Sequence, residues 1–336
     1  MEASLRQVSA PAPDTTALDD APVLVHVTRG GFVESAHRAT LVATDGTGGT
    51  PLRHGRVDDP VLPRSSLKPV QALAMVRLGL DLPPHLLALV CSSHSGEAVH
   101  REAVAEILAT ADLGLDALRT TPSLPLGEIE HARWLAAGEA PTPVAMDCSG
   151  KHAGMLVTCV LQGWPTETYL DPEHPLQVAI RETVAEVVGP VTHTTVDGCG
   201  APLFAVPLSG LAAAFGALAG ADATTDEGRV AAAMRTAPEM VGGTGRDVTA
   251  FMRAVPGLIA KDGAEAVYAA GLDDGRGIAI KVADGAPVAR ARQGLLAHAL
   301  MALGVDTPAL HELADQPVLG HGRPVGAVEV LDLTTS

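Results

Sequence analysis

The chain has 336 residues, a formal net charge of −16, and hydrophobic residues at 47% of its positions. This composition provides for a sizeable core and excludes a largely disordered chain, because only 18% of the residues are charged. The acidic balance and an aromatic fraction of 2% also exclude nucleic acid as the main partner, since phosphate binding needs Lys and Arg and base stacking needs aromatic rings.

The hydropathy of the chain indicates a soluble, cytoplasmic protein that does not contact a membrane. Residues 1–21 carry acids and prolines where a signal peptide would have a basic start and an apolar core, so we predict a disordered leader there. The uncharged stretch 198–221 is rich in Ala and Gly and contains two prolines. These residues favour a loop followed by a buried helix over a membrane span.

Alternating and periodic hydropathy predicts strands near both ends of the chain and helices between them. Residues 23–50 are predicted to form two antiparallel strands, the second ending in a turn at Asp45-Gly46, and residues 258–285 a β-meander. Helices are expected at 65–80, 98–113, 128–137, 150–162, 175–188, 208–218, 227–237, 249–255 and 289–303, before a polar tail. This order favours an α+β fold in which the terminal strands join one antiparallel sheet.

The first candidate for chemistry is the segment RSSLK, which places Ser65 and Lys68 one helical turn apart. A serine hydroxyl becomes a good nucleophile when a neighbouring base takes its proton, and a lysine is such a base only if its pKa is lowered. Pro69 is tolerated in the first turn, so Ser65 would lie at a helix start, where free N–H groups favour an anion. Alternatively, Ser66 caps the helix and Lys68 is solvated.

The second candidate is the junction CSSHSGE, in which hydroxyls, an imidazole and a carboxylate follow an apolar run and precede a helix. Ser93, His94 and Glu97 are the side chains of interest there. The alternative is structural: Ser95 caps the helix and His94 is a hydrogen-bonded turn residue.

The third candidate pairs Cys148 in MDCSGKH with Cys199 in DGCG, a pattern with the local geometry of a thiolate metal site. A disulfide between the two cysteines, or two buried thiols, would also explain it. Reduced thiols are the default expectation, because a disulfide scaffold would be shorter and richer in cysteine. Cys159 lies in an apolar helix and is expected to be a core residue.

The fourth candidate is Lys261, which leaves an apolar strand and is followed by Asp262 and Gly263. This segment is similar to the Lys-Thr-Gly strand of serine β-lactamases, with Asp in place of Thr. A hairpin with a surface lysine is the alternative.

The order of these motifs resembles that of the rhizobial-type L-asparaginases, the asparaginase II family, over about residues 22–330. The blocks that carry the resemblance are RGGFVESAHR, RSSLK, CSSHSGE, MDCSGKHAGML, DGCGAP, PEMVGGTGR and LIAKDGAEAV. The resemblance implies a serine β-lactamase/glutaminase-like fold, with an antiparallel sheet flanked by helices in a single catalytic domain over 22–336, with two lobes as an open alternative. It also implies a homodimer that hydrolyses L-asparagine to L-aspartate and ammonia.

The resemblance further implies which residues act. Ser65 and Lys68 would form one Ser–Lys pair, and Ser93 and Lys261 the second. Zinc would be the cofactor. The zinc ligands and the substrate-binding residues would come from the blocks CSSHSGE, MDCSGKHAGML and DGCGAP. The metal ligands are Cys148, Lys151 and Cys199, and the substrate-binding candidates are His94, Glu97, His152 and Asp197.

The mechanism expected from this assignment is acyl transfer. Ser65, deprotonated by Lys68, attacks the side-chain amide, backbone N–H groups hold the oxyanion, and a proton relayed through Ser93 and Lys261 leaves with ammonia. Zinc would position the substrate rather than generate hydroxide. The alternatives are a glutaminase, a serine β-lactamase-like acyl hydrolase, and a non-catalytic zinc-stabilised binding protein.

Overall fold

The computed structural model describes residues 16–285 and 290–334. Its strands are β1 (Val23–Arg29), β2 (Phe32–Thr44), β3 (Leu52–His54), β4 (Pro60–Val61), β5 (His193–Val196), β6 (Pro202–Pro207), β7 (Ile259–Gly263), β8 (Val267–Gly271), β9 (Gly277–Val282), β10 (Pro317–Gly320) and β11 (Arg323–Val330). Its helices are α1 (Thr16–Asp19), α2 (Lys68–Arg77), α3 (Pro84–Val90), α4 (Ala98–Ala109), α5 (Glu128–Ala136), α6 (Ser149–Gln162), α7 (Pro175–Val187), α8 (Leu208–Gly220), α9 (Asp226–Thr236), α10 (Pro238–Val241), α11 (Asp247–Ala254), α12 (Arg290–Ala302) and α13 (Pro308–Ala314), with 3₁₀ turns η1 (Arg64–Leu67) and η2 (Leu115–Ala117).

The main sheet is antiparallel and joins the two ends of the chain. Its strand order is β10-β11-β1-β2-β9-β8-β7, with β3 paired to β2. The long strand β2 connects the halves, since its first part pairs with β1 and its second part with β9. A smaller sheet has the order β4-β6-β5. The expected α+β fold, with terminal strands in one antiparallel sheet, is confirmed.

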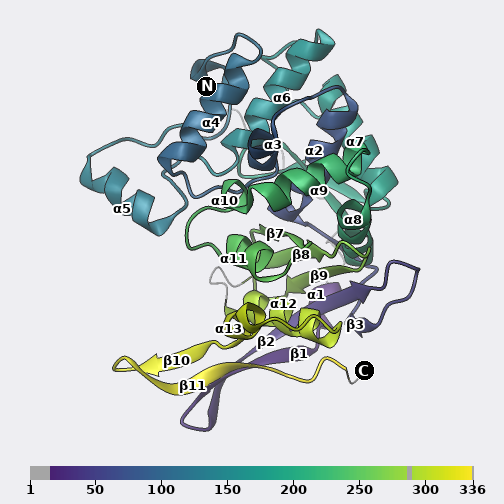
Figure 1. The fold of residues 1–336 in the computed structure, drawn as a ribbon, viewed down its shortest axis with the longest axis vertical. Coiled ribbons are helices and arrows are strands. Elements are labelled where there is room, and N and C mark those ends of the chain that lie inside the picture. The colour runs from purple at the N-terminus through teal and green to yellow at the C-terminus, as the bar shows by residue number, and fades with distance from the viewer. Residues whose placement is uncertain (1–15, 286–289, 335–336) are drawn as a thin grey trace, which may run out of the picture.

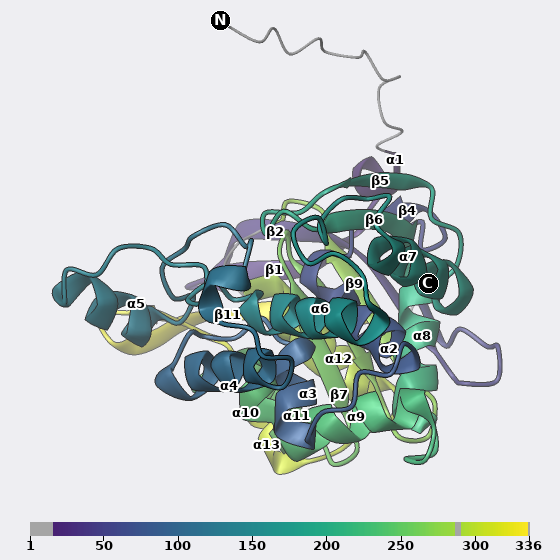
Figure 2. The same ribbon diagram turned by 90° about the horizontal axis from the view of Figure 1, so that it is seen from above.

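Helices cover this sheet in layers. Figure 1 shows α2, α3, α6, α7 and α9 gathered above the strands, whereas α12 and α13 lie beside β10 and β11. Both α8 and α12 contact β8 and β9, and every residue of these two strands is buried, so the strands are covered on both faces. The view from above in Figure 2 shows α2 and α6 crossing over the sheet.

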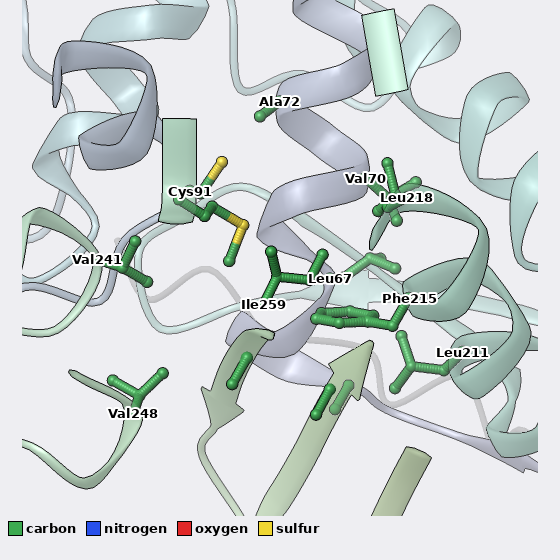
Figure 3. Packing of buried hydrophobic residues seen from close by; sticks show 14 of the residues in the cluster. Leu67, Val70, Ala72, Cys91, Leu211, Phe215, Leu218, Val241, Val248 and Ile259 are labelled. Atoms are coloured by element: carbon green, nitrogen blue, oxygen red, sulfur yellow. The ribbon is translucent and has the colours of Figure 1, made fainter. Parts of the chain in front are cut away.

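The core of the molecule holds the start of α2 against the sheet. Figure 3 shows Leu67 beside Ile259 of β7 and Phe215 of α8. All three side chains are fully or almost fully buried and belong to one hydrophobic cluster. This packing fixes the segment that carries the first sequence motif against β7, the first strand of the β-meander.

Most predicted elements are present, with shifted boundaries. The meander at 258–285 is β7 to β9, and the uncharged stretch 198–221 contains β6 and α8. No helix within the described ranges is long and apolar enough to cross a membrane. The first predicted helix begins as η1 and continues as α2, because Pro69 has no N–H to donate and lies in the first turn of α2.

The ends of the chain hold structure that the sequence did not reveal. The polar tail contains α13, β10 and β11, and β11 pairs with β1. Residues 1–15 of the predicted leader, and Ala289 at the start of the last predicted helix, lie outside the described residues; the short helix α1 lies within the leader range.

Helix α8 packs on the sheet through glycines, which gives a test of the packing. A Cβ added at Gly277 would lie 1.9 Å from the Ala212 carbonyl oxygen of α8. We expect Gly277→Ala to lower the free energy of unfolding by about 1–3 kcal/mol, the usual cost of overpacking. Denaturant unfolding measures this. Gly114→Ala is the matched control, because its new methyl would meet only the end of the Asp116 side chain. Equal stability of both variants would contradict close packing at Gly277.

Candidate active site

Three segments that are distant in the sequence meet at the start of α2. The turn η1 packs against the end of β7, since a Cβ at Gly263 would lie 2.6 Å from the Pro63 carbonyl oxygen. The loop after α3 is held in place by backbone hydrogen bonds from Ser93 to Val241 and from His94 to Asp147. The chain therefore brings the first, second and fourth sequence motifs to one place.

Lys68 is the central side chain of this junction. It is 1% exposed, and its Nζ donates to the Ser92 carbonyl oxygen at 2.6 Å and to Ser93 Oγ at 2.9 Å. Asp147 Oδ2 lies 3.5 Å from the same amine. Burial lowers the pKa of Lys68, but the nearby Cys148 and Asp147 outweigh burial and raise the pKa above its ordinary value. The amine is therefore held as a cation against Ser93.

This hydrogen bond joins the lysine of one predicted Ser–Lys pair to the serine of the other pair. The hydrogen bond joins Lys68 to Ser93, and Ser65 Oγ makes no hydrogen bond within the described ranges. Ser65 lies in η1, whereas Lys68 is the first residue of α2, so the two do not stand on one regular helix. The pairings Ser65–Lys68 and Ser93–Lys261 stay predictions.

Lys261 is the middle residue of β7 and is fully buried. Its Nζ donates to the carbonyl oxygen of Asp262 at 2.7 Å and to Oδ1 of Asp262 at 2.6 Å. Burial lowers the pKa of Lys261 to about 8, and the charge of Lys68 adds to this shift while Asp262 opposes it. Lys261 therefore loses its proton more readily than Lys68. It is not the surface lysine of the alternative interpretation.

The two predicted thiol ligands lie together. Cys148 and Cys199 are buried, free of disulfides, and share a small apolar cluster with Ala201. A hydrogen bond between the thiols lowers the pKa of Cys199 and raises that of Cys148, so the pair holds one thiolate more readily than two. Lys151 Nζ lies 3.5 Å from Cys199 Sγ. Cys148 and Cys199 are therefore not joined by the disulfide of the alternative interpretation.

His152 stands next to this thiol pair. Its Nδ1 is 2.7 Å from the Tyr169 hydroxyl, and its Nε2 is buried with no hydrogen-bond partner in the described part of the chain. Cys199 is close enough to influence the pKa of His152, which burial lowers. His152 is therefore neutral, with one imidazole nitrogen left free beside the thiols.

These donors fit zinc. Two thiols and a neighbouring amine are soft and borderline ligands of the kind that zinc takes in proteins. Among the described residues there is no group of three or more His, Cys, Asp or Glu side chains placed to hold a metal. A site here therefore depends on Lys151 as the ligand beside the two cysteines, as the resemblance implies.

His94 and Glu97, two of the predicted substrate-binding residues, are engaged within the fold. His94 is fully buried; its Nε2 is 2.8 Å from Ser149 Oγ, and its Nδ1 accepts the N–H of Gly96. Glu97 accepts the Thr244 N–H at 2.7 Å and its hydroxyl at 3.0 Å. Both side chains are thus engaged by other parts of the chain, and substrate binding by them stays a prediction.

Asp197 is held at the site by Arg64. The Arg64 guanidinium donates to Asp197 Oδ1 through Nε at 2.9 Å and Nη2 at 2.8 Å. Arg64 has a φ of +53°, a left-handed conformation that is uncommon for a residue with a side chain. It directly precedes Ser65, so this strained residue sets the direction of the chain at the predicted nucleophile.

Sequence reasoning missed the carboxylates and guanidinium that surround the lysines. Asp147 and Asp262 each contact a lysine of the site, and Arg246 donates to Asp262. All three lie inside the quoted motif blocks, but only the two carboxylates lie directly beside a selected residue, Asp147 before Cys148 and Asp262 after Lys261. Adjacency was the available signal for them, although spacing along the chain does not tell which neighbour turns inward. Arg246 ends a block from which no residue was selected, so no such signal pointed to it.

Comparison with known protein families gives a match over most of the chain. A family model described as L-asparaginase II matches residues 25–330. No curated protein gives a match. The matched range contains every site residue described above.

Proposed function

The chain belongs to the L-asparaginase II family and is an L-asparaginase, and we propose that it hydrolyses L-asparagine to L-aspartate and ammonia through a serine acyl-enzyme. The observation that carries the proposal is the buried Lys68–Ser93 hydrogen bond, beside the turn that holds Ser65 and the strand β7 that holds Lys261. Two hydroxyls and two amines in one buried junction are the parts that serine acyl transfer needs.

In the first half of the proposed reaction, Ser65 Oγ attacks the side-chain amide carbon of asparagine. The serine O–H proton is transferred to a lysine amine, the carbon–nitrogen bond breaks, and the leaving nitrogen takes a proton to become ammonia. The first N–H groups of η1 hold the oxyanion, because the start of a helix leaves such groups without intrahelical partners. Water then cleaves the ester to give aspartate and regenerate the serine.

The two lysines are suited to different steps of this reaction. Lys68, proposed as the base for Ser65, must first lose its own proton, and Asp147 and Cys148 oppose that loss. Lys261 is neutral in a larger fraction of molecules at neutral pH, because its pKa is lowered to about 8. We therefore assign proton uptake to the pair, with Ser93 as the hydroxyl that joins them.

Zinc is part of the proposal. Cys148, Lys151 and Cys199 would hold the ion, and the free Nε2 of His152 lies beside them. The ion supplies positive charge that orients a polar substrate group. Lys151 would have to be neutral to bind zinc.

We further propose that the protein works in the cytoplasm as a homodimer, without nucleic-acid or membrane partners. The family resemblance supports the dimer. The net charge of −16 supports the lack of nucleic-acid binding, because it opposes contact with phosphates.

Substrate choice is tested by ammonia release from L-asparagine and L-glutamine, with nitrocefin turnover run in parallel. We expect kcat/KM for asparagine to exceed that for glutamine by about tenfold or more, since one extra methylene changes binding by about 1–3 kcal/mol. Nitrocefin turnover above asparagine turnover would contradict the proposal and favour a β-lactamase-like hydrolase.

The roles of the two serines are tested by single alanine substitutions. Each serine is replaced in one variant, and the serine next to it is replaced in a separate control variant. We expect Ser65→Ala and Ser93→Ala to lose ammonia release by several orders of magnitude with folding preserved. The matched controls are Ser66→Ala and Ser92→Ala, because Ser66 Oγ bonds only to the Pro63 carbonyl oxygen and Ser92 Oγ has no partner among the described residues. If all four variants retain activity, the serines are structural and the chemistry is carried elsewhere.

The metal site is tested by elemental analysis of the purified protein. We expect about one zinc per chain, lost in Cys148→Ala because two thiolates anchor the ion. Cys159→Ala serves as the control, since Cys159 is buried in the main core, away from the second thiol cluster. Metal-free wild-type protein after purification with added zinc, or zinc retained in Cys148→Ala, would contradict the site.

A further inference from the structure

Arg246 joins two parts of the site that no motif connects. One nitrogen of its guanidinium, Nη1, donates to the Ser93 carbonyl oxygen at 3.2 Å, and the other, Nη2, donates to Asp262 Oδ2 at 2.7 Å. The second oxygen of the same carboxylate, Oδ1, accepts from Lys261 Nζ at 2.6 Å. A continuous series of hydrogen bonds therefore runs from the Ser93 backbone to the Lys261 amine.

We propose that Arg246 is a positioning residue, whose single guanidinium fixes the Ser93 backbone and, through Asp262, the direction of the Lys261 amine. The inference rests on the proposed function, in which Ser93 and Lys261 take part in proton transfer. Arg246 does not touch the reacting atoms; it acts on them through two neighbours.

The shape of arginine explains why this position needs it. A guanidinium presents several donors in a rigid plane and can hold two acceptors at once, whereas a lysine amine is a single point charge on a flexible stem. Asp262 is 5% exposed, so its charge needs close compensation. Arg246 supplies that compensation on one oxygen and leaves the other oxygen for Lys261.

Arg246 is itself held by the segment that it positions. It follows a glycine-rich loop, and Glu97 accepts two hydrogen bonds from Thr244 of that loop. Ser95 N donates to the Gly242 carbonyl oxygen at 2.8 Å, and a Cβ at Gly243 would lie 2.4 Å from Ser95 Oγ. The close approach requires glycine at 243. Loop 242–245 and the Ser93–Glu97 segment therefore form one unit, with Arg246 at its end.

Arg292 offers a matched comparison. It also reaches Asp262 Oδ2, at 3.5 Å, and it contacts Asp247 at 3.5 Å and the Gly263 carbonyl oxygen at 3.1 Å. It has no hydrogen bond to Ser93. A role limited to neutralising buried carboxylates would be shared by both arginines, whereas positioning Ser93 and Lys261 together belongs to Arg246.

The charges around Lys261 determine whether its pKa rises or falls when a neighbouring residue is replaced. Asp262 favours the protonated amine, while Lys68 of α2 and Arg246 disfavour it. The other titratable groups packed around this junction are Cys91, Asp147, Asp247, Tyr268 and Arg292. Loss of the Arg246 charge should therefore raise the pKa of Lys261, and loss of the Asp262 charge should lower it.

The first experiment compares steady-state kinetics of Arg246→Lys, Arg246→Met and Arg292→Lys with the wild type. We expect both Arg246 variants to lose about tenfold to a hundredfold in kcat with little change in KM, as when a group that orients a catalytic residue is removed. Arg292→Lys should lose clearly less. Thermal unfolding of each variant separates these losses from loss of fold, and the charge-conserving Arg246→Lys keeps the test valid if Arg246→Met does not fold.

The second experiment reads the Lys261 amine directly and does not depend on turnover. The chain has four lysines, Lys68, Lys151, Lys261 and Lys281, so protein with ¹³C at the lysine ε-carbon gives four NMR signals, and Lys261→Met assigns one of them. We expect the titration of Lys261 to move up by about one pH unit in Arg246→Met and down by a similar amount in Asp262→Asn. It should stay near the wild-type value in Arg246→Lys, in which the charge is kept.

Three outcomes would overturn the inference. They are equal kcat losses in Arg246→Lys and Arg292→Lys, unchanged kcat in both Arg246 variants, and a Lys261 titration that does not move in Arg246→Met. Wild-type protein that releases no ammonia from asparagine, but shows the expected Lys261 shifts, would contradict the proposed function and support the link between Arg246 and Lys261.

Discussion

Two buried lysine amines of like charge lie close together where the start of α2 packs against β7. Lys68 and Lys261 are each almost fully buried, and the charge of Lys68 lowers the pKa of Lys261. Desolvation and like-charge repulsion both disfavour two ammonium groups in one place. A carboxylate beside each amine offsets this unfavourable free energy. Asp147 lies beside Lys68, and Asp262 lies beside Lys261.

The two carboxylates have different effects, because their own surroundings differ. Asp147 and the neighbouring Cys148 outweigh the burial of Lys68, which stays charged. Asp262 does not outweigh the burial of Lys261, since its charge is shared with the guanidinium groups of Arg246 and Arg292. One amine is thus kept as a hydrogen-bond donor and the other is close to losing its proton at neutral pH. Such a separation of pKa values divides acid and base roles in enzymes.

Hydropathy periodicity predicted most of the helices and the meander, because a helix or strand with one buried face repeats its apolar residues at a fixed interval. It did not predict that β11 pairs with β1, since a strand of eight residues with no fully buried side chain carries a weak pattern. The order of the motifs along the chain, through its resemblance to a known family, predicted that the four segments belong to one site. The crosswise Lys68–Ser93 hydrogen bond could not be read from spacing, because it depends on the 3₁₀ turn before α2 and on the loop after α3.

The distribution of lysine in the chain fits the same chemistry. Of the 23 Lys and Arg residues only four are lysines, and all four are buried. Surface ion pairs such as Arg77–Glu186 use arginine, which stays charged at any pH that the protein meets. Lysine is used in place of arginine at buried positions that need either a compact hydrogen-bond donor or a group that can lose its proton. Lys281 shows the first use, because its Nζ donates to the carbonyl oxygen of Glu265, a residue with a left-handed φ of +58° at the turn between β7 and β8. That turn follows β7, so the fourth lysine supports the hairpin whose first strand carries Lys261.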